Sequence, residues 1–146
     1  MNEISPASRF SVEPSVANHF AWLRTRLGIE RTFMAWIRTA VSLIGFGFTI
    51  VQFFQRLQGM EGTGILRKMR PQEPRDLGLA LIATGIGALA ISSWQYRREL
   101  GYLWSEPFRA IAGVGDRPHR TPAFLAAMVL IVIGIAAFVS VFFHFL

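Results

Sequence analysis

Apolar residues are concentrated in three long runs that contain no charged residue, separated by segments rich in charge, glycine and proline. The uncharged runs cover residues 39–55, 77–96 and 121–146. A helix needs roughly 20 apolar residues to cross the ~30 Å hydrocarbon core of a bilayer, and its backbone groups must pair within the segment because lipid offers no partners. Each run therefore predicts a transmembrane α-helix. With their flanking residues, the predicted spans are about 34–55, 77–96 and 122–145.

The segment before the first span changes character at about residue 16. Residues 1–15 are rich in serine, proline and asparagine, which predicts a disordered tail, and charges interrupt any apolar stretch suited to a cleaved export signal. Further along, apolar residues recur at spacings of three, four and seven, the period of one helical face. The members of this face are Val16, Phe20, Leu23, Leu27, Met34, Ile37 and Val41. The predicted fold is therefore all-α: an integral membrane protein with three transmembrane helices in one domain, residues 16–146, and an amphipathic N-terminal helix running into the first span.

Basic residues divide equally among the polar segments, with five up to Arg38, five in the loop after the first span and five in the loop before the third. With three spans, the N-terminal segment and the second loop share one side of the membrane. Since cytoplasmic loops carry the excess of Lys and Arg, the N-terminus is predicted to be cytoplasmic. The C-terminus is then predicted on the opposite side of the cell inner membrane.

Composition narrows the possible functions. Hydrophobic residues make up 52% of the chain and charged residues 16%, which disfavours a soluble domain of 146 residues. The net charge is +6, and the basic residues lie outside the apolar runs. Attraction to anionic lipid headgroups explains this placement better than binding to nucleic acid does. There is no cysteine, so disulfides and thiolate chemistry are excluded. No nucleophile–base pair or phosphate loop stands out, and His19, His119 and His144 lie in distant segments. We expect no enzyme activity, no metal and no cofactor.

An arginine pattern precedes the first span. The pair Arg-Thr occurs at 24–25, 31–32 and 38–39, a spacing of seven that keeps Arg24, Arg31 and Arg38 on one side of a helix. These arginines are candidate anion ligands, because ionisable residues near hydrocarbon tend to face protein, water or an ion. The alternative is that they anchor the helix at lipid phosphates and fix its orientation.

Four further charged residues are included in the predicted anion site. Arg97 and Arg98, at the end of the second span, are added to the candidate anion ligands. Glu30 is one turn after Arg26, so these two can form an ion pair or orient the site. Trp22 and Trp36 are interpreted as members of the aromatic belt at the membrane interface. For every residue in this group, the alternative is that it only forms part of a solvated or lipid-facing surface.

The second span carries small residues at regular spacing. Ala80, Thr84, Ala88 and Ser92 recur every four residues, and Gly78 and Gly85 form a second strip. Small residues at this spacing let helix backbones approach closely in a membrane. Two alternatives follow from this pattern: packing between copies in a homo-oligomer, or packing among the protein's own helices.

The segment around the second Arg-Thr pair resembles the signature of the YidH-like membrane family, domain of unknown function 202. The matching residues are Leu27, Glu30, Arg31, Thr32, Ala35, Trp36, Arg38 and Thr39, followed by Gly45 and Gly47. The family is more distantly similar to the membrane domain of vacuolar transporter chaperone subunits. That likeness implies a pentamer whose basic helix ends line a path for polyphosphate. The 146 residues include no polymerase domain, so synthesis of polyphosphate is not implied.

Together these features predict a non-enzymatic homo-oligomer with an Arg-lined cytoplasmic mouth, which binds or conducts a phosphate- or polyphosphate-like anion. The alternative is a structural or accessory subunit that binds anionic lipid or a partner membrane protein and transports nothing.

Overall fold

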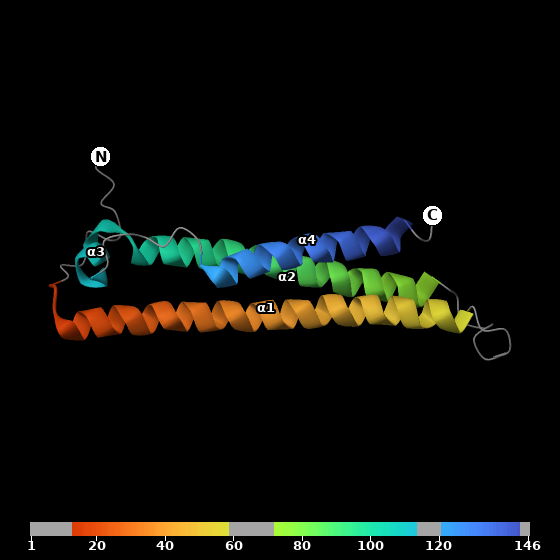
Figure 1. Ribbon diagram of the computed structural model, residues 1–146, viewed down its shortest axis with the longest axis horizontal. Coiled ribbons are helices and arrows are strands. Elements are labelled where there is room, and N and C mark those ends of the chain that lie inside the picture. The colour runs from red at the N-terminus through yellow and green to blue at the C-terminus, as the bar shows by residue number, and fades with distance from the viewer. Residues whose placement is uncertain (1–12, 59–71, 114–120, 144–146) are drawn as a thin grey trace.

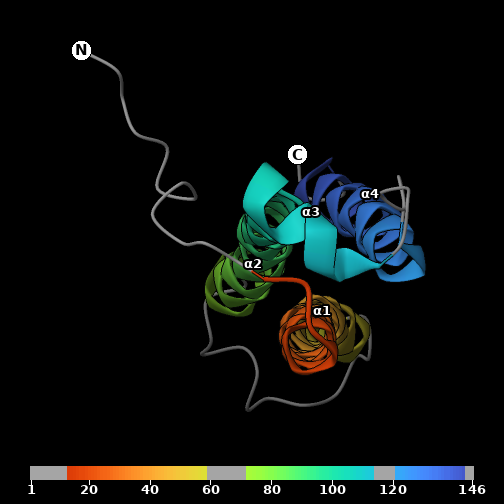
Figure 2. The same ribbon diagram turned by 90° about the vertical axis from the view of Figure 1, so that its left-hand side faces the viewer.

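The computed structural model describes residues 13–58, 72–113 and 121–143. Helices make up nearly all of these residues: α1 Val16–Gln58, α2 Gln72–Leu103, α3 Glu106–Ala112 and α4 Pro122–Phe143. Helices α1, α2 and α4 run side by side with alternating direction (Figure 1), and the short α3 lies across one end (Figure 2). Within the described residues, three helices are long and apolar enough to cross a membrane. The predicted all-α fold is confirmed, and the chain is a multi-pass membrane protein.

Helix α1 is a single uninterrupted rod. It contains 43 residues and no proline, so at 1.5 Å per residue it is about 65 Å long, about twice the thickness of the hydrocarbon core. Ser15 caps its start, where the hydroxyl accepts a hydrogen bond of 3.2 Å from the backbone N–H of Asn18. The predicted amphipathic helix therefore runs into the first span without a break.

Helices α1 and α2 meet along a seam where small residues bring their backbones together. A Cβ atom added to Gly47 would lie 2.7 Å from the carbonyl oxygen of Gly78, and one added to Gly85 would lie 2.9 Å from that of Ala40. Real Cβ atoms do not approach this closely, so only glycine fits at these crossings. The Gly78 and Gly85 strip therefore packs within the protein, which is the intramolecular alternative left open by the sequence.

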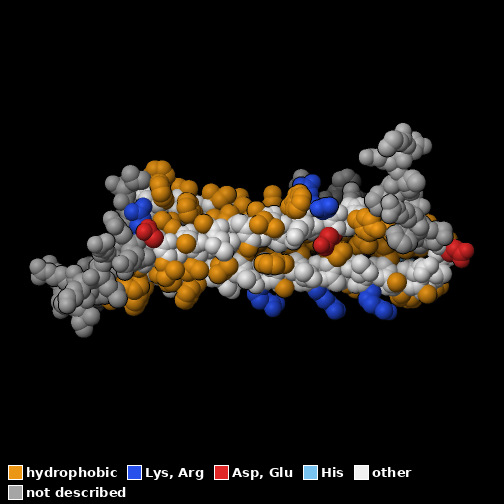
Figure 3. Space-filling view, turned by 180° about the vertical axis from the view of Figure 1, so that it is seen from behind, with side chains coloured by type: hydrophobic (Ala, Val, Ile, Leu, Met, Phe, Trp, Pro, Cys, Tyr) orange, Lys and Arg blue, Asp and Glu red, His pale blue; other side chains and the backbone are white. Residues whose placement is uncertain are grey.

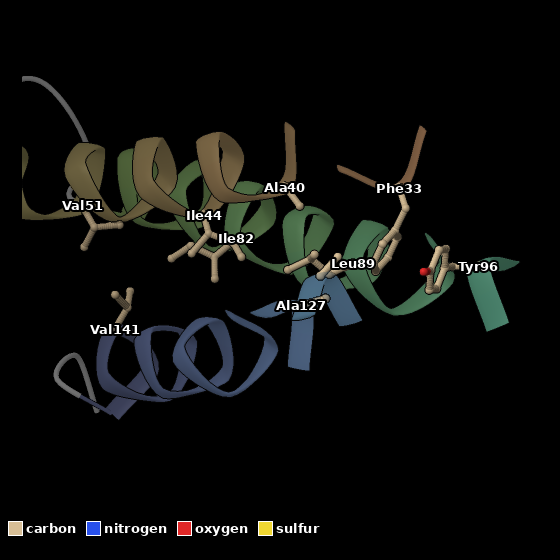
Figure 4. Close-up of a cluster of buried hydrophobic side chains, with 10 residues drawn as sticks. Phe33, Ala40, Ile44, Val51, Ile82, Leu89, Tyr96, Ala127 and Val141 are labelled. Carbon is tan, nitrogen blue, oxygen red and sulfur yellow. The ribbon is translucent and has the colours of Figure 1, made fainter. Parts of the chain in front are cut away.

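Larger side chains fill the space between these crossings and form the core (Figure 4). Its buried members from the three long helices are Phe33, Ala40, Ile44, Val51, Ile82, Leu89, Tyr96, Ala123, Ala127 and Val141. Helix α4 contributes its small residues here and leaves most of its large ones exposed. Exposed Val, Ile and Phe side chains on α4 are the surface expected against lipid.

Helix α4 begins part of the way along α2, at a level fixed by three side chains. The Tyr96 hydroxyl lies 3.1 Å from the Thr121 Oγ1 atom, and the Phe33 and Tyr96 rings stack with centroids 4.4 Å apart. From this level α4 continues for 22 residues, or about 33 Å, which matches the hydrocarbon core. We call the level of Phe33, Tyr96 and Thr121 the boundary level.

Beyond the boundary level a second, smaller core holds the projecting end, which comprises residues 16–32 of α1, residues 97–103 of α2, and α3. Trp22 is only 3% exposed, and its indole N–H donates a 3.0 Å hydrogen bond to the carbonyl oxygen of Leu103. A ring nitrogen of His19 lies 2.6 Å from the carbonyl oxygen of Ile111, so α1 satisfies the last carbonyls of both α2 and α3. Gly113, at φ 67°, ends α3 in the left-handed conformation that favours glycine.

The projecting end differs from the sequence predictions in two respects. The prediction that Trp22 is a lipid-facing belt residue is wrong, because this side chain is buried against Leu103 and Trp104. Helix α3 was not predicted. The proposed disordered tail falls mostly on residues 1–12, and much of the first loop on residues 59–71, both outside the described residues.

Candidate functional site

The Arg-Thr repeat places three arginines on one exposed side of α1. Arg24, Arg31 and Arg38 are all exposed, and basic side chains are seen spaced along α1 at the lower edge of Figure 3. Seven helical residues rise about 10 Å, so the guanidinium groups follow one another at that interval. We call these three residues the arginine stripe.

The threonines of the repeat are turned to their own helix. The hydroxyl groups of Thr25, Thr32 and Thr39 each donate to the backbone carbonyl four residues earlier, at 3.0, 3.0 and 3.1 Å. Their protons are therefore engaged, while the oxygen lone pairs remain free to accept hydrogen bonds. The threonines do not compete with the arginines for an anion.

The stripe crosses the boundary level. Arg24 lies on the projecting end, Arg31 lies half a turn outside Phe33, and Arg38 lies five residues inside it, or about 7–8 Å along the helix. Within the described part of the chain, none of the three forms an ion pair within 4.0 Å. An exposed guanidinium at hydrocarbon depth is costly unless water, an anion or a lipid phosphate meets it.

The predicted pair of Arg26 and Glu30 is not formed between these two described residues. Instead the Arg26 guanidinium lies over the Trp22 ring, 5.7 Å from its centroid, where the ring face attracts the cation. Glu30 is half-buried beside the stripe. Arg26 therefore contributes to packing of the projecting end.

The two arginines at the end of the second span are separate from the stripe. Arg97 lies 5.5 Å above the Phe124 ring of α4, and Arg98 lies 5.7 Å above the Trp94 ring of α2 itself. Both arginines are exposed. The five candidate anion ligands thus divide into three on α1 and two on α2.

The small residues that recur every four positions on α2 (Ala80, Thr84, Ala88 and Ser92), here called the small ridge, pack only in part against the rest of the chain. Ala80 and Thr84 are exposed, Ala88 is half-buried beside the core, and Ser92 is buried. Nothing lies within 4 Å of a Cβ added to Gly87 on the same exposed side. The half of the ridge around Ala80 and Thr84 remains available for contact with another helix.

A hollow between α1 and α2 was not predicted from the sequence. It has a volume of about 500 Å³, and its lining residues are Thr25, Ile29, Trp94, Gln95, Arg98, Glu99, Tyr102 and Leu103. A smaller hollow of about 30 Å³ adjoins it through the shared residues Ile29, Gln95 and Glu99, and extends to Trp36 and Ser92. The lining residues come from segments about 60 residues apart in the chain, so no local pattern could reveal them.

Metal-binding groups do not gather in the described residues: no three of His, Cys, Asp and Glu lie close enough to hold an ion. His19 contacts the end of α3, whereas His119 and His144 fall outside the described residues.

Comparison with known proteins identifies one family. A family model described as "Domain of unknown function (DUF202)" matches residues 24–101, which include the arginine stripe and most of α2. No curated protein and no solved structure matches the chain. The similarity to vacuolar transporter chaperone subunits therefore stays a prediction.

Proposed function

The chain belongs to the DUF202 family of membrane proteins, whose role is unknown, and we propose that it is a non-enzymatic subunit of a homo-oligomer that binds a phosphate-rich anion at the arginine stripe. The anion is phosphate or a polyphosphate-like chain. The stripe faces the cytoplasm in the orientation that the basic residues predict.

The observation that carries this proposal is the state of Arg38. It is exposed inside the boundary level and forms no ion pair within 4.0 Å among the described residues. The Cα–Cβ bond of a helical residue tilts toward the N-terminal end of its helix, so the Arg38 side chain leaves α1 on the side nearer Arg31. Guanidinium groups match phosphate oxygens with a planar fork of donors. An elongated polyanion can meet successive members of a stripe with a 10 Å interval, which a single phosphate cannot.

A homo-oligomer is proposed because the positive charge of the arginine stripe must be shielded from lipid. The arginine stripe lies on the surface of a subunit of three long helices, and such a subunit encloses no hydrated path by itself. Copies arranged around an axis can turn their α1 arginines toward a shared aqueous mouth. The exposed Ala80 and Thr84 of α2 offer a place where a neighbouring helix can approach.

Replacing Arg31 or Arg38 by lysine tests whether the guanidinium group itself is required. Lysine keeps the positive charge but lacks the bidentate fork. We expect each variant to bind long-chain polyphosphate on the order of tenfold more weakly, the effect of losing one charge-assisted hydrogen bond. The measurement is titration calorimetry of the purified protein in mild detergent, with orthophosphate as the short-ligand comparison.

Arg56→Lys is the matched control, because Arg56 is an exposed arginine in the last turn of the same helix, at the opposite end. It should bind polyphosphate as the parent does. If Arg31→Lys and Arg38→Lys also bind like the parent, the stripe acts only as positive charge. The proposal then fails in favour of an accessory subunit anchored by anionic lipid.

The oligomer is tested by adding bulk to the exposed ridge. Ala80→Leu places a large side chain where a neighbouring backbone should approach, whereas Ala136→Leu makes the same change at an exposed position of α4. We expect chemical crosslinking in membranes to yield fewer oligomers for Ala80→Leu and parental amounts for Ala136→Leu. Equal crosslinking of the two variants would remove the ridge from the subunit contact.

A further inference from the structure

The two adjoining hollows form one groove between α1 and α2, here called the α1–α2 groove. We propose that this groove binds an ethanolamine phospholipid, whose phosphate pairs with Arg98 and whose primary ammonium group meets the acceptors around Glu99. This inference is independent of the anion proposed for the arginine stripe.

The position of the groove is the first argument. It extends from Trp36 and Ser92, on the hydrocarbon side of the boundary level, to Thr25 and Tyr102 on the projecting end. The polar groups therefore lie where the uncharged part of α2 ends, at the depth of lipid headgroups. The volume of about 500 Å³ is in the range of small-molecule sites and accommodates a headgroup with its glycerol.

The charges in the groove are the second argument. One guanidinium and one carboxylate line the larger hollow, from the neighbouring residues Arg98 and Glu99. Among the described residues Glu99 forms no ion pair within 4.0 Å, and Arg98 is held above the Trp94 ring. A zwitterion with a phosphate and an ammonium matches this pair of opposite charges, whereas an anionic headgroup would be repelled by Glu99.

The hydrogen-bonding groups decide which zwitterion fits. The hydroxyl groups of Thr25 and Thr32 already donate to backbone carbonyls, so they face the groove as acceptors together with the Glu99 carboxylate and the Gln95 amide oxygen. A primary ammonium has three N–H donors for these acceptors. A choline headgroup has no N–H donor, so it would leave these acceptors without hydrogen-bond partners.

Native mass spectrometry of the purified, delipidated full chain tests the proposal. The protein is titrated with phosphatidylethanolamine, phosphatidylcholine and phosphatidylglycerol of identical acyl chains. We expect phosphatidylethanolamine to bind on the order of tenfold more tightly than either of the others, as one charge-assisted hydrogen bond provides. Glu99→Gln should lower this binding to the level of phosphatidylcholine.

Two further variants separate the roles of the charges. Arg98→Gln should weaken phosphatidylethanolamine and phosphatidylcholine to the same extent, because both carry the phosphate. Glu106→Gln removes a carboxylate of α3 that lies near Arg109, at 3.8 Å, and does not line the larger hollow, so the preference should persist. Equal binding of the two zwitterionic lipids by the parent, tighter binding of phosphatidylglycerol, or an unchanged preference in Glu99→Gln would each overturn the proposal.

Discussion

Gly85→Leu should prevent stable packing of α1 against α2. The new Cβ atom would lie 2.9 Å from the Ala40 carbonyl oxygen and 2.7 Å from the Ile44 Cγ1 atom. A backbone oxygen cannot rotate away as a side chain can, so the two helices must separate. We expect a loss of about 3 kcal/mol in the free energy of unfolding, in the upper part of the range for overpacked cores. The destabilisation is detected in mild detergent as a lower temperature of thermal aggregation and as a lower melting temperature by circular dichroism.

Gly87→Ala is the control on the same helix, because alanine adds only a Cβ and keeps the exposed ridge of α2 small. No atom lies within 4 Å of a Cβ added to Gly87, and alanine favours the helix over glycine by roughly 0.8–1 kcal/mol. This variant should therefore melt at the parental temperature or above it. Equal destabilisation by the two substitutions would mean that the close approach of the helices does not limit stability.

Trp22→Ala should release the projecting end while leaving the membrane-spanning part folded. Trp22 is 3% exposed and fills the small core shared by α1, α2 and α3. Truncation of a buried aromatic residue costs roughly 3–5 kcal/mol, and here it also leaves the carbonyl oxygen of Leu103 without its indole donor. Hydrogen exchange should become much faster at the amides of α3 and remain slow in the α1–α2 seam.

Trp36→Ala provides the comparison, since Trp36 is 46% exposed on the same helix. It should leave the exchange rates of α3 unchanged. If both substitutions accelerate exchange in α3 equally, or if neither does, Trp22 does not hold the projecting end.

The membrane architecture was predictable because it depends on properties that a sequence displays directly. Uncharged runs give the spans, and a periodic apolar pattern gives the helical segment before the first one. The position of the arginine stripe was predictable for the same reason, since a spacing of seven keeps Arg24, Arg31 and Arg38 on one side of any helix. These features need no knowledge of which helices touch.

Features that depend on pairing between helices were less accessible. Phe20, Leu27 and Met34 formed the evident apolar face, yet all three are exposed. The buried face of α1 instead contains Phe33, Ala40, Ile44, Gly47 and Val51. Ala40 and Gly47 are small because the backbones approach closely there. Since the whole span is apolar, hydropathy does not indicate which of its sides is packed against another helix.

The length of the paired helices has a mechanical consequence. Helix α1 is about 65 Å long and has no proline at which to bend, and it is fastened to α2 at both ends, near Gly78 and at Leu103. A membrane-spanning helix whose hydrophobic stretch is longer than the local hydrocarbon core adapts to a thinner bilayer by tilting. Because α1 and α2 are joined in this way, we expect them to tilt together as one rigid body. A change in bilayer thickness then moves the projecting end sideways, and the movement is larger the further this end lies from the membrane.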